Sequence, residues 1–363
     1  MVTRFTLFAA CWGLLATSSP CARAEQLPGN ESKPYYRAEL IFQPTPRFPR
    51  CHSSTITVLP DGTLIAAWWN GSEEGATDVV IRAARRLPGK GLWETPRIVS
   101  DTPGTTEGNP VLFAAPNGEV WLFHRVGLNP WKRIVWFRSR DRGRTWTGPT
   151  VLIGESGWTL RSRIVTLQNG DIVIPAMKQD ASVFLISSDR GETWRKSTEI
   201  VTRPRNNEAT LIQRRDGSLL AFMRPYDPPP AKRLIWQSES VDNGRTWSAP
   251  ARTGFHNPSS AIELLRLRSG AVVLVFNDDN DKRTPLNLAI SEDEGRTWNR
   301  ARVLEDGAGR FEYPTMTETA DGRIHISYSF RRLSIKHIEI NEAWIRERFP
   351  ASANNREPAG IVK

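Results

Sequence analysis

Glutamate, tyrosine and arginine recur in this sequence at one distance from a glycine turn. Glu208 and Tyr313 each stand eight residues before an Asp-Gly dipeptide, and Arg224 stands eight residues after the first of these dipeptides. A carboxylate beside a phenol can act as its general base, because an unperturbed tyrosine pKa of about 10 leaves the hydroxyl neutral at neutral pH. An arginine guanidinium binds a carboxylate through two parallel hydrogen bonds. These residue types therefore indicate nucleophilic chemistry on an acidic substrate, if the fold brings them together.

The turns that set this spacing divide most of the chain into similar units. Six Gly-containing dipeptides lie between apolar runs, at intervals of 47 to 56 residues: Asp61-Gly62, Asn117-Gly118, Asn169-Gly170, Asp216-Gly217, Ser269-Gly270 and Asp321-Gly322. Asn-Gly and Asp-Gly supply the positive φ angles of tight β-hairpins. A regular period of this length indicates one supersecondary unit that is repeated.

A second repeat, an eight-residue box, follows the hairpin in four of the six units. The box occurs four times, as SRDRGRTW, SSDRGETW, SVDNGRTW and SEDEGRTW, ending at Trp146, Trp194, Trp247 and Trp298. A degenerate copy, LPGKGLW, ends at Trp93. The glycine permits a left-handed backbone, and the Asp, Ser and Thr side chains can accept hydrogen bonds from nearby N–H groups. The Trp can bury a large apolar surface between units. We interpret the box as architecture and not as a catalytic motif.

Each unit is predicted to be a four-stranded antiparallel blade, so the fold class is all-β. Six such blades over residues 25–349 predict a six-bladed β-propeller, which closes into a ring. The segment YRAELIFQP (36–44) is expected to close it against HISYSF and IKHIEI. Innermost strands begin at one rim of the central funnel, eight or nine residues before the hairpins, at His52, Asn109, Arg161, Glu208, Ser260 and Tyr313. Second strands return to that rim at Trp69, Arg125, Met177, Arg224, Asn277 and Ser329.

The N-terminal 24 residues are expected to be a secretory signal peptide. Arg4 precedes the apolar run 5–16, and Ala22-Arg23-Ala24 matches an A-x-A cleavage site. Cleavage before Glu25 would predict a periplasmic or secreted monomer without a membrane span, and residues 350–363 are predicted to be a disordered tail. Cys51 is the one cysteine after residue 24, which excludes an intrachain disulfide in the processed chain.

The basic net charge of the chain is explained first by ordinary solubility, with an anionic partner as the alternative, and nucleic acid is not expected. The net charge of +10 falls to +8 on processing, because the signal segment holds two arginines and no acid. Acidic residues are interspersed with the basic ones and no dense Lys/Arg run occurs, so nucleic acid is not expected. The histidines lack metal-ligand spacing and no Gly-rich phosphate loop occurs, so we expect no metal and no cofactor.

The boxes resemble the Asp-boxes, or BNR repeats, of the sialidase (neuraminidase) superfamily, over nearly the whole chain that follows the signal segment. NNEATLIQRRDGSLLAFMR resembles the sialidase segment that runs from the active-site Glu to an arginine of the arginine triad, which implies Glu208 and Arg224. RTPLNLAISEDEGRTW resembles the segment of another triad arginine, which implies Arg283. GRFEYPTM resembles the segment of the nucleophilic tyrosine, which implies Tyr313. The resemblance implies a sialidase-like propeller that hydrolyses sialosides.

The first blade departs from the sialidase pattern. Sialidases carry an Arg-Ile-Pro motif there, but RFPRCHSSTITV aligns Cys51 or His52 with its arginine, and Arg50 is the nearest substitute. The sialidase acid/base aspartate aligns with Glu74 in WWNGSEEGATDVVI, and Asp78 lies close by in the sequence. Substrate-binding candidates are therefore Arg224, Arg283, Arg50, His52, Arg161, Asn109 and Trp69. Catalytic candidates are Tyr313, Glu208, Glu74 and Asp78.

Three functions are compatible with these residues. The first is an exo-acting glycoside hydrolase of the sialidase type that releases a terminal acidic sugar, with sialic acid as the leading substrate. The second is a uronate-directed glycosidase or polysaccharide lyase, in which His52 and Tyr313 would transfer protons. The third is a non-catalytic glycan-binding propeller, which predicts that Tyr313 and Glu208 are out of hydrogen-bonding reach of each other.

Overall fold

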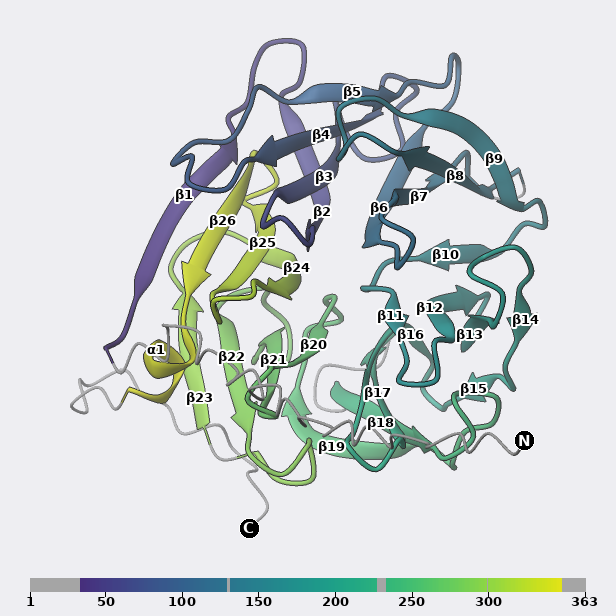
Figure 1. Ribbon diagram of the computed structural model, residues 1–363, viewed down its shortest axis with the longest axis vertical. Coiled ribbons are helices and arrows are strands. Elements are labelled where there is room, and N and C mark those ends of the chain that lie inside the picture. The colour runs from purple at the N-terminus through teal and green to yellow at the C-terminus, as the bar shows by residue number, and fades with distance from the viewer. Residues whose placement is uncertain (1–32, 129–130, 227–232, 299, 348–363) are drawn as a thin grey trace, which may run out of the picture.

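The computed structural model describes residues 33–128, 131–226, 233–298 and 300–347, and nearly all of its regular structure is β. The expected signal peptide (1–24) and the expected tail (350–363) lie outside the described residues. Within the described ranges, no helix is long and apolar enough to cross a membrane. Around the ring, six antiparallel sheets are arranged as a six-bladed β-propeller, which confirms the predicted fold class (Figure 1).

The strands of each blade follow one another in the sequence, from the centre of the ring outward. Blade 1 holds β2 (Arg50–Val58), β3 (Leu64–Gly71), β4 (Val80–Arg86) and β5 (Arg97–Ser100). Blade 2 holds β6 (Glu107–Ala114), β7 (Val120–Val126), β8 (Arg133–Ser139) and β9 (Thr147–Ile153). Blade 3 has broken inner and outer strands: β10 (Trp158–Leu160), β11 (Val165–Thr166), β12 (Ile172–Lys178), β13 (Ala181–Ser187), β14 (Arg195–Lys196) and β15 (Ile200–Val201).

The second half of the ring repeats the same order. Blade 4 holds β16 (Asn206–Gln213), β17 (Leu219–Pro225), β18 (Leu234–Ser240) and β19 (Ala251–His256). Blade 5 holds β20 (Glu263–Arg266), β21 (Val272–Asn277), β22 (Leu286–Ser291) and β23 (Arg300–Glu305). Blade 6 holds β24 (Phe311–Glu318), β25 (Ile324–Phe330), β26 (Ser334–Ile340) and, as its outer strand, β1 (Tyr36–Phe42). A short helix, α1 (Glu342–Arg346), follows β26.

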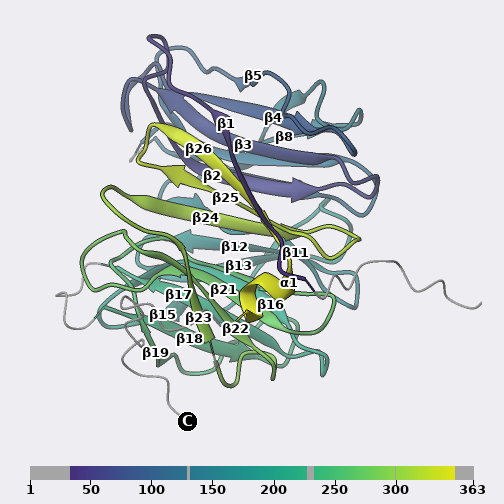
Figure 2. The same cartoon turned by 90° about the vertical axis from the view of Figure 1, so that its left-hand side faces the viewer.

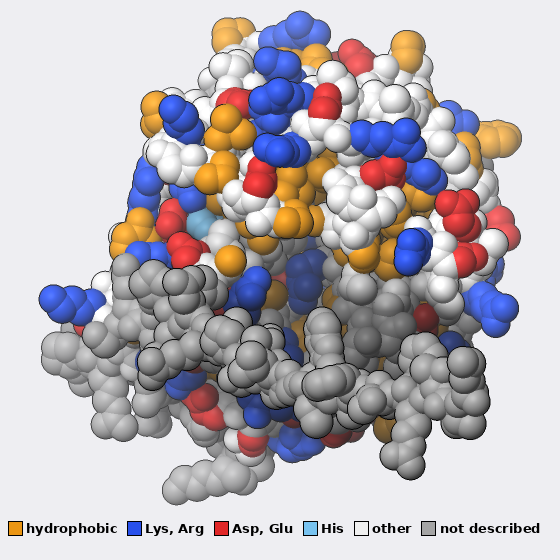
Figure 3. Space-filling model, viewed as in Figure 1, with side chains coloured by type: hydrophobic (Ala, Val, Ile, Leu, Met, Phe, Trp, Pro, Cys, Tyr) orange, Lys and Arg blue, Asp and Glu red, His pale blue; other side chains and the backbone are white. Residues whose placement is uncertain are grey.

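The ring is closed by the first strand of the chain, as the sequence predicts. β1 pairs antiparallel with β26, from Tyr36 opposite Ile340 to Leu40 opposite Lys336, so the two ends of the propeller share one sheet (Figures 1 and 2). This pairing covers the edge of blade 6, which would otherwise expose unpaired N–H and C=O groups. The face of the ring shown in Figure 3 is hollowed at its centre, and Lys and Arg side chains lie in that hollow.

The four intact boxes form one repeated turn between the third and fourth strands of blades 2 to 5. In the first box the Ser139 hydroxyl donates to Asp141 (2.8 Å) and accepts from the Gly143 N–H (2.8 Å). Asp141 also accepts from the backbone N–H of Thr145 (2.8 Å) and from its hydroxyl (2.6 Å). The same bonds recur at Asp189, Asp242 and Asp293. This end of the blades is opposite to the rim at which the innermost strands begin, so the boxes are remote from the funnel opening.

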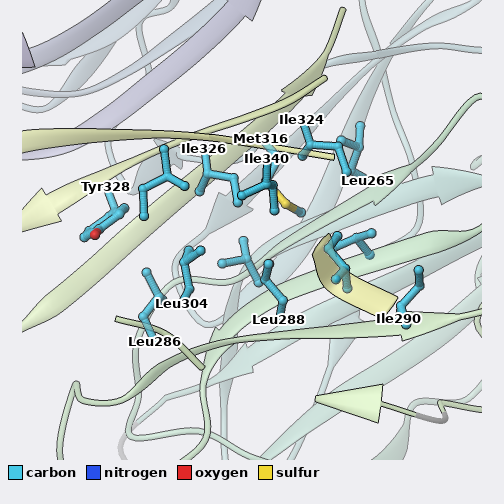
Figure 4. Close-up of a cluster of buried hydrophobic side chains, with 14 of the residues drawn as sticks. Leu265, Leu286, Leu288, Ile290, Leu304, Met316, Ile324, Ile326, Tyr328 and Ile340 are labelled. Atoms are coloured by element: carbon cyan, nitrogen blue, oxygen red, sulfur yellow. The ribbon is translucent and has the colours of Figure 1, made fainter. Parts of the chain in front are cut away.

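The tryptophans of the boxes join neighbouring blades. The ring of Trp247 in blade 4 stacks on Phe184 of blade 3, with centroids 4.3 Å apart. Trp298 of blade 5 packs against Phe222 of blade 4 with the rings tilted by 45° and their centroids 5.8 Å apart. Between blades 5 and 6, alternate residues of facing strands interdigitate in a continuous apolar layer (Figure 4), which includes Leu286, Leu288, Ile290, Ile324, Ile326 and Tyr328. Alternation is the period of a strand, so one face of each sheet meets the next blade.

The boxes predict a specific loss of stability in acid. Hydrogen bonds from Thr145 and Ser139 lower the pKa of Asp141 from 3.8 to about 2, against the opposing effect of burial. Since the folded-state pKa is depressed, the stabilisation is complete above the unfolded pKa and is lost as the pH falls from about 4 to about 2. We expect Asp141→Asn to lower the free energy of unfolding at pH 7 and to flatten its pH dependence in that window, as measured by urea unfolding. An equal slope in variant and wild type would contradict this assignment.

Candidate active site

The innermost strands of four blades are interrupted at the same position, which in two of them is occupied by the catalytic candidates Glu208 and Tyr313. Ser53, Asn109, Glu208 and Tyr313 have φ angles of 57°, 50°, 47° and 58°, and each stands eight residues before the Asp or Asn of its hairpin. The pairing of each strand with its neighbour shifts register at this point. A left-handed backbone is unusual for a bulky residue such as tyrosine, and such strain is concentrated at functional sites. In blades 4 and 6 the bulge presents the side chains of Glu208 and Tyr313 at the rim.

Tyr313, Glu208 and Arg224 form a closed triangle. The Tyr313 hydroxyl donates to Glu208 Oε1 at 3.1 Å, and Arg224 Nη1 donates to Glu208 Oε2 at 2.5 Å. The same Nη1 lies 3.0 Å from the Tyr313 oxygen. Glu208 and Arg224 are almost fully buried, whereas Tyr313 is partly exposed. The phenol is therefore the member of the triangle that a ligand can reach. The non-catalytic interpretation predicted that Tyr313 and Glu208 lie out of hydrogen-bonding reach of each other, and the 3.1 Å contact contradicts that prediction.

The pKa shifts of the triangle keep the phenol neutral and its partner charged. Burial raises the pKa of Tyr313, and the nearby Glu208 carboxylate raises it further. Burial alone would raise the pKa of Glu208, but Arg224 and Arg161 hold it below its ordinary value. Burial would lower the pKa of Arg224, and contact with Glu208 and Tyr313 raises it instead. At neutral pH the site holds a neutral hydroxyl hydrogen-bonded to a carboxylate, which is the starting state for general-base activation.

Arg283 lies beside Arg224 and is held by two partners. It pairs with Glu312, the residue before Tyr313, and its Nη2 donates to the Ser259 carbonyl oxygen at 2.8 Å. Arg224 Nη2 donates to the Ser259 hydroxyl at 3.2 Å. The guanidinium carbons of Arg224 and Arg283 lie 5.8 and 5.7 Å from the centroid of the Tyr313 ring. The structure thus brings together four of the residues that the sequence predicts: Tyr313, Glu208, Arg224 and Arg283.

Arg161 reaches the same cluster from beneath. Its guanidinium carbon lies 4.9 Å from the Tyr313 ring centroid, and its Nη2 donates to the Pro314 carbonyl oxygen at 3.1 Å. Only 2% of the residue is exposed. The sequence predicts a substrate-binding role for Arg161, but a side chain buried below the phenol cannot contact a ligand in this state. Its positive charge acts through Glu208, whose pKa it helps to lower.

In the first blade, His52 and not Cys51 faces the cluster. Cys51 is fully buried in the apolar core between blades 6 and 1, whereas the His52 ring lies 4.1 Å from the Tyr313 ring, centroid to centroid. Since a guanidinium has no acceptor, the 3.3 Å contact with Arg332 Nη2 assigns a lone pair to His52 Nε2. Nδ1 then carries the proton and donates to the Ser329 hydroxyl (2.8 Å). Burial holds the pKa of His52 well below its ordinary value, so the ring is neutral at neutral pH.

The structure buries Trp69 and leaves Asn109 partly exposed at the rim. Trp69 is 2% exposed and packs in the core between blades 1 and 2, with its ring edge-on to His52 at 6.0 Å. Its side chain takes the core-facing position of β3, so it supports the wall of the site and does not line it. Asn109 occupies the strained position of blade 2, equivalent to that of Glu208, and is partly exposed.

Of the acidic candidates in blade 1, Glu74 joins the cluster and Asp78 does not. Glu74 Oε2 accepts from Arg332 Nη1 at 2.8 Å, and 47% of its side chain is exposed. Both oxygens of Asp78 are turned back into the loop, where they accept from the N–H and hydroxyl of Ser72. Arg50 is exposed, and its side chain makes no hydrogen bond or ion pair with any described residue. The predicted roles of Asp78 and Arg50 therefore find no support in the geometry.

Three residues of the cluster were not selected from the sequence. Glu312 is fully buried and receives Arg283, Arg310 and Arg332. Arg332 lies in the turn between β25 and β26, three residues beyond the position that the hairpin spacing marks in this blade. Arg125, which does stand at a marked position, donates to the Gly127 carbonyl oxygen (2.8 Å) and interacts electrostatically with Glu74 and Tyr313. The only sequence feature that could have pointed to Glu312 as a site residue is its position next to Tyr313.

The cluster as a whole carries an excess of positive charge. Six guanidinium groups interact with four carboxylates: Arg125, Arg161, Arg224, Arg283, Arg310 and Arg332 with Glu74, Glu208, Glu263 and Glu312. Within the described ranges, no group of three or more His, Cys, Asp or Glu could hold a metal ion. The arrangement can bind an anion and can activate a phenol next to it.

Comparison with known proteins identifies the same repeat. Residues 62–326 match the family described as BNR repeat-like domain. Among curated proteins, a sialidase from Micromonospora viridifaciens is 23% identical over 91% of this chain and 58% of its own length. The curated relatives extend beyond the match, because the chain spans between 42% and 62% of their lengths.

Solved structures share the fold at lower identity. A protein of unknown function from Dyadobacter fermentans superposes with a TM-score of 0.73 and 18% identity, over 84% of this chain and 99% of that one. The NanB sialidase from Streptococcus pneumoniae also superposes with a TM-score of 0.73, at 14% identity over 85% of this chain and 71% of that one. These similarities establish the propeller architecture and not the substrate.

Proposed function

The chain belongs to the BNR repeat-like domain family of the sialidase superfamily, and we propose that it is an exo-acting glycoside hydrolase of the sialidase type. It would release a terminal acidic sugar, with sialic acid as the leading substrate. The observation that carries the proposal is the 3.1 Å hydrogen bond from the partly exposed Tyr313 hydroxyl to the buried Glu208 carboxylate. The sialidase relatives, which are 23% to 26% identical to this chain, support the same class of reaction.

A phenol nucleophile suits a sugar that carries a carboxylate on its anomeric carbon. A carboxylate nucleophile would be repelled there, whereas neutral Tyr313 is not. Tyrosine nucleophiles are a known exception among glycosidases and occur in sialidases. Arg224 and Arg283, which flank the phenol, would hold the sugar carboxylate through charge-assisted hydrogen bonds. Binding of the carboxylate would thereby place the anomeric carbon above the Tyr313 oxygen.

The reaction would proceed in two displacements. In the first, the Tyr313 oxygen bonds to the anomeric carbon, its proton passes to Glu208, and the bond to the leaving oxygen breaks as Glu74 donates a proton to that oxygen. In the second, Glu74 accepts a proton from water, the water oxygen attacks the anomeric carbon, and the Tyr313 oxygen leaves and recovers its proton from Glu208. The two displacements together predict retention of the anomeric configuration.

The alternative of a uronate lyase depends on His52 as a proton acceptor. His52 does contact the Tyr313 ring, but it is 1% exposed and its Nε2 lone pair is directed at Arg332. Both features favour a positioning role for His52 over proton abstraction from a substrate. The hydrolase is therefore the function that the geometry supports better.

The proposal is tested by assaying the purified protein on fluorogenic α-sialosides, uronides and rhamnosides. We expect turnover of at least one acidic glycoside and little turnover of rhamnosides. The reducing sugar that is released should retain its anomeric configuration when followed by NMR. Formation of an unsaturated uronate, detected by its ultraviolet absorbance, would establish the lyase instead, and inactivity on every acidic glycoside would refute the hydrolase.

Substitution of Glu74 should slow hydrolysis in a manner that depends on the leaving group. Glu74→Gln removes the proton donor but not the nucleophile, so glycosides with poor leaving groups should lose about 10²–10⁴-fold in kcat. Aryl glycosides with acidic phenols, which leave without protonation, should lose much less. The matched control is Glu73→Gln, which removes the same charge from an exposed neighbour. Equal losses across the series of leaving groups would exclude Glu74 as the general acid.

Substitution of Arg224 by lysine should weaken substrate binding while the positive charge is retained. A lysine ammonium cannot form the planar pair of hydrogen bonds that a guanidinium forms with a carboxylate. We expect Arg224→Lys to cost about 1–3 kcal/mol of binding free energy, the scale of one hydrogen bond to a charged group. The measurement is kcat/KM on an acidic glycoside, and an unchanged value would argue against the clamp.

The proposal also includes export and a monomeric state. N-terminal sequencing of the exported protein should begin at Glu25, and light scattering should give the mass of one processed chain. An exported protein that begins at Met1 would contradict the signal-peptide prediction.

A further inference from the structure

A buried carboxylate lies beneath the site and has no part in the two displacements. Glu263 is the first residue of β20 in blade 5, and it is fully buried. It stands six residues before the Ser269-Gly270 turn, whereas Glu208 and Tyr313 each stand eight residues before their turns. Two residues of a strand span about 7 Å, so Glu263 lies deeper along the funnel axis than the catalytic pair.

The ion-pair partner of Glu263 comes from blade 3, which is not its neighbour in the ring. Arg163 lies in the break between β10 and β11, and its Nε is 3.6 Å from Glu263 Oε1. The Arg163 backbone N–H donates to Glu263 Oε2 at 3.5 Å. Both contacts are long, and Glu263 Oε1 is buried without a hydrogen bond to any described residue. The carboxylate is therefore removed from water without full compensation.

Arg161 stands two residues before Arg163 and lies between two carboxylates. The negative charges of Glu208 and Glu263 both stabilise its guanidinium, whose carbon lies 4.9 Å from the Tyr313 ring centroid. Its Nε and Nη1 are buried, and neither makes a hydrogen bond with a described residue. Arg161 is thus not committed to either carboxylate by a direct hydrogen bond, and its charge acts on both.

Glu263 can change its own charge near neutral pH. Burial raises its pKa to about 7, although Arg163 and Arg161 oppose the rise. β21, which pairs with β20, holds no titratable side chain. The titratable side chains of the other strands packed against β20 are Glu208 of β16 and Glu312, Tyr313 and Glu318 of β24, and β20 itself also holds Arg266.

We propose that Glu263 is a positioning residue of the active site, whose carboxylate shares the charge of Arg161 with Glu208 and so keeps Glu208 able to accept the phenolic proton. This inference rests on the proposed reaction, in which Glu208 is the general base for Tyr313. With Glu263 ionised, two carboxylates share Arg161, and Glu208 takes up a proton more readily. With Glu263 protonated, Arg161 acts on Glu208 alone and stabilises its charged form, so proton transfer from Tyr313 is less favourable.

Glu263→Gln tests the inference through the pH dependence of the rate. The amide has nearly the shape of the protonated carboxyl group, so variant and wild type should differ only where Glu263 is ionised. We expect the ratio of wild-type to variant kcat to be near one below about pH 6 and to rise about three- to tenfold above about pH 8, because a base that loses about one pKa unit loses up to tenfold in rate. KM on an acidic glycoside should stay within about twofold, since Arg224 and Arg283 are unchanged.

Two further variants separate this effect from packing. Glu263→Asp keeps the carboxylate and should retain the rise of wild-type activity with pH. Glu318→Gln alters another partly buried carboxylate of an innermost strand, whose electrostatic neighbours are Arg268, Asp321 and Glu342, and its ratio to the wild type should not vary with pH. A ratio for Glu263→Gln that is constant with pH would refute the positioning role.

A second measurement does not depend on hydrolysis. In protein labelled with ¹³C at the glutamate carboxyl carbons, the resonance that is lost in Glu263→Gln should titrate near pH 7 in the wild type. Coupling between two sites is reciprocal, so Glu208→Gln should lower the pH of this titration by about one unit, because Arg161 then acts on Glu263 alone. Arg161→Gln should raise it, because a cation is lost. Titration at the ordinary glutamate pKa of about 4, or no response to either variant, would refute the shared arginine.

The wild type should also lose stability as Glu263 ionises. Because its folded-state pKa is raised above the unfolded value, this contribution is complete below about pH 4 and is lost as the pH rises to about 7. Glu263→Gln should therefore fold and should lack this decline in urea unfolding. If Glu208→Gln fails to fold, Arg161→Gln and the kinetic ratio still decide.

Failure of this inference is distinguishable from failure of the proposed function. A protein that hydrolyses no acidic glycoside, but in which the titration of Glu263 responds to Glu208→Gln and Arg161→Gln, would contradict the hydrolase and support the sharing of Arg161. A protein that hydrolyses acidic glycosides with a constant ratio for Glu263→Gln would refute the role of Glu263 alone.

Discussion

Tyr313→Phe is expected to abolish hydrolysis while the fold is retained. The substitution removes one oxygen, the atom that would bond to the anomeric carbon, and loss of a catalytic nucleophile costs at least about 10³-fold in kcat. The ring should keep its packing, since it contacts His52 and lies over Arg161 without use of the hydroxyl. The measurement is kcat on an acidic aryl glycoside, together with the thermal unfolding midpoint of the variant.

Binding separates this prediction from a structural defect. Tyr313→Phe should bind the free acidic sugar within about tenfold of the wild-type affinity, because the arginines that would hold the carboxylate are unchanged. Full activity of Tyr313→Phe on every acidic glycoside tested would exclude the tyrosine mechanism. It would favour the alternative in which His52 transfers protons. Loss of both binding and cooperative unfolding would instead indicate that the hydroxyl is needed for the fold.

Glu208→Gln is expected to impair both catalysis and stability. The amide cannot accept the phenolic proton, so kcat should fall by about 10²–10⁴-fold, the usual range for loss of a general base. The amide also leaves Arg224 without its buried counter-charge, and breaking a buried ion pair from one side costs about 3–5 kcal/mol of unfolding free energy. Urea unfolding and steady-state kinetics measure the two effects separately.

The double variant Glu208→Gln/Tyr313→Phe tests whether the pair acts as a unit. If Glu208 serves only to activate Tyr313, the double variant should be no slower than Tyr313→Phe alone, because there is no phenol left to activate. Its stability should remain close to that of Glu208→Gln, since Tyr313→Phe removes no charge. Multiplicative losses of activity in the double variant would show that Glu208 acts on the substrate independently of Tyr313.

The sequence by itself determined the architecture of this protein. Six hairpin dipeptides and four boxes are local signals: the left-handed glycine of the turn and the Ser, Asp and Thr bonds of the box depend on residues within a few positions of each other. Repetition at a nearly constant interval then implies a ring. The same spacing placed Glu208, Arg224 and Tyr313 at one rim, because a strand of known direction and length leads from each turn to that rim.

The hairpin spacing could not predict which site residues of different blades contact one another. Glu312 and Arg332 lie in blade 6, Arg283 in blade 5, and Glu74 in blade 1, so their contacts depend on closure of the ring. The sequence left Cys51 and His52 as alternatives at one position. Only the structure showed that Cys51 packs in the core and that His52 turns toward Tyr313, since the register shift after His52 decides which side chain faces the funnel.

Burial was the second property that only the tertiary structure decided. Arg161 and Trp69 stand at the marked positions, yet one lies beneath the phenol and the other in the core between blades. Arg332 stands three residues beyond a marked position and reaches the rim because its turn is tied to β2. The spacing along a strand predicts how far along the funnel axis a residue lies. The direction and exposure of its side chain are set by the packing of neighbouring blades, which no local pattern records.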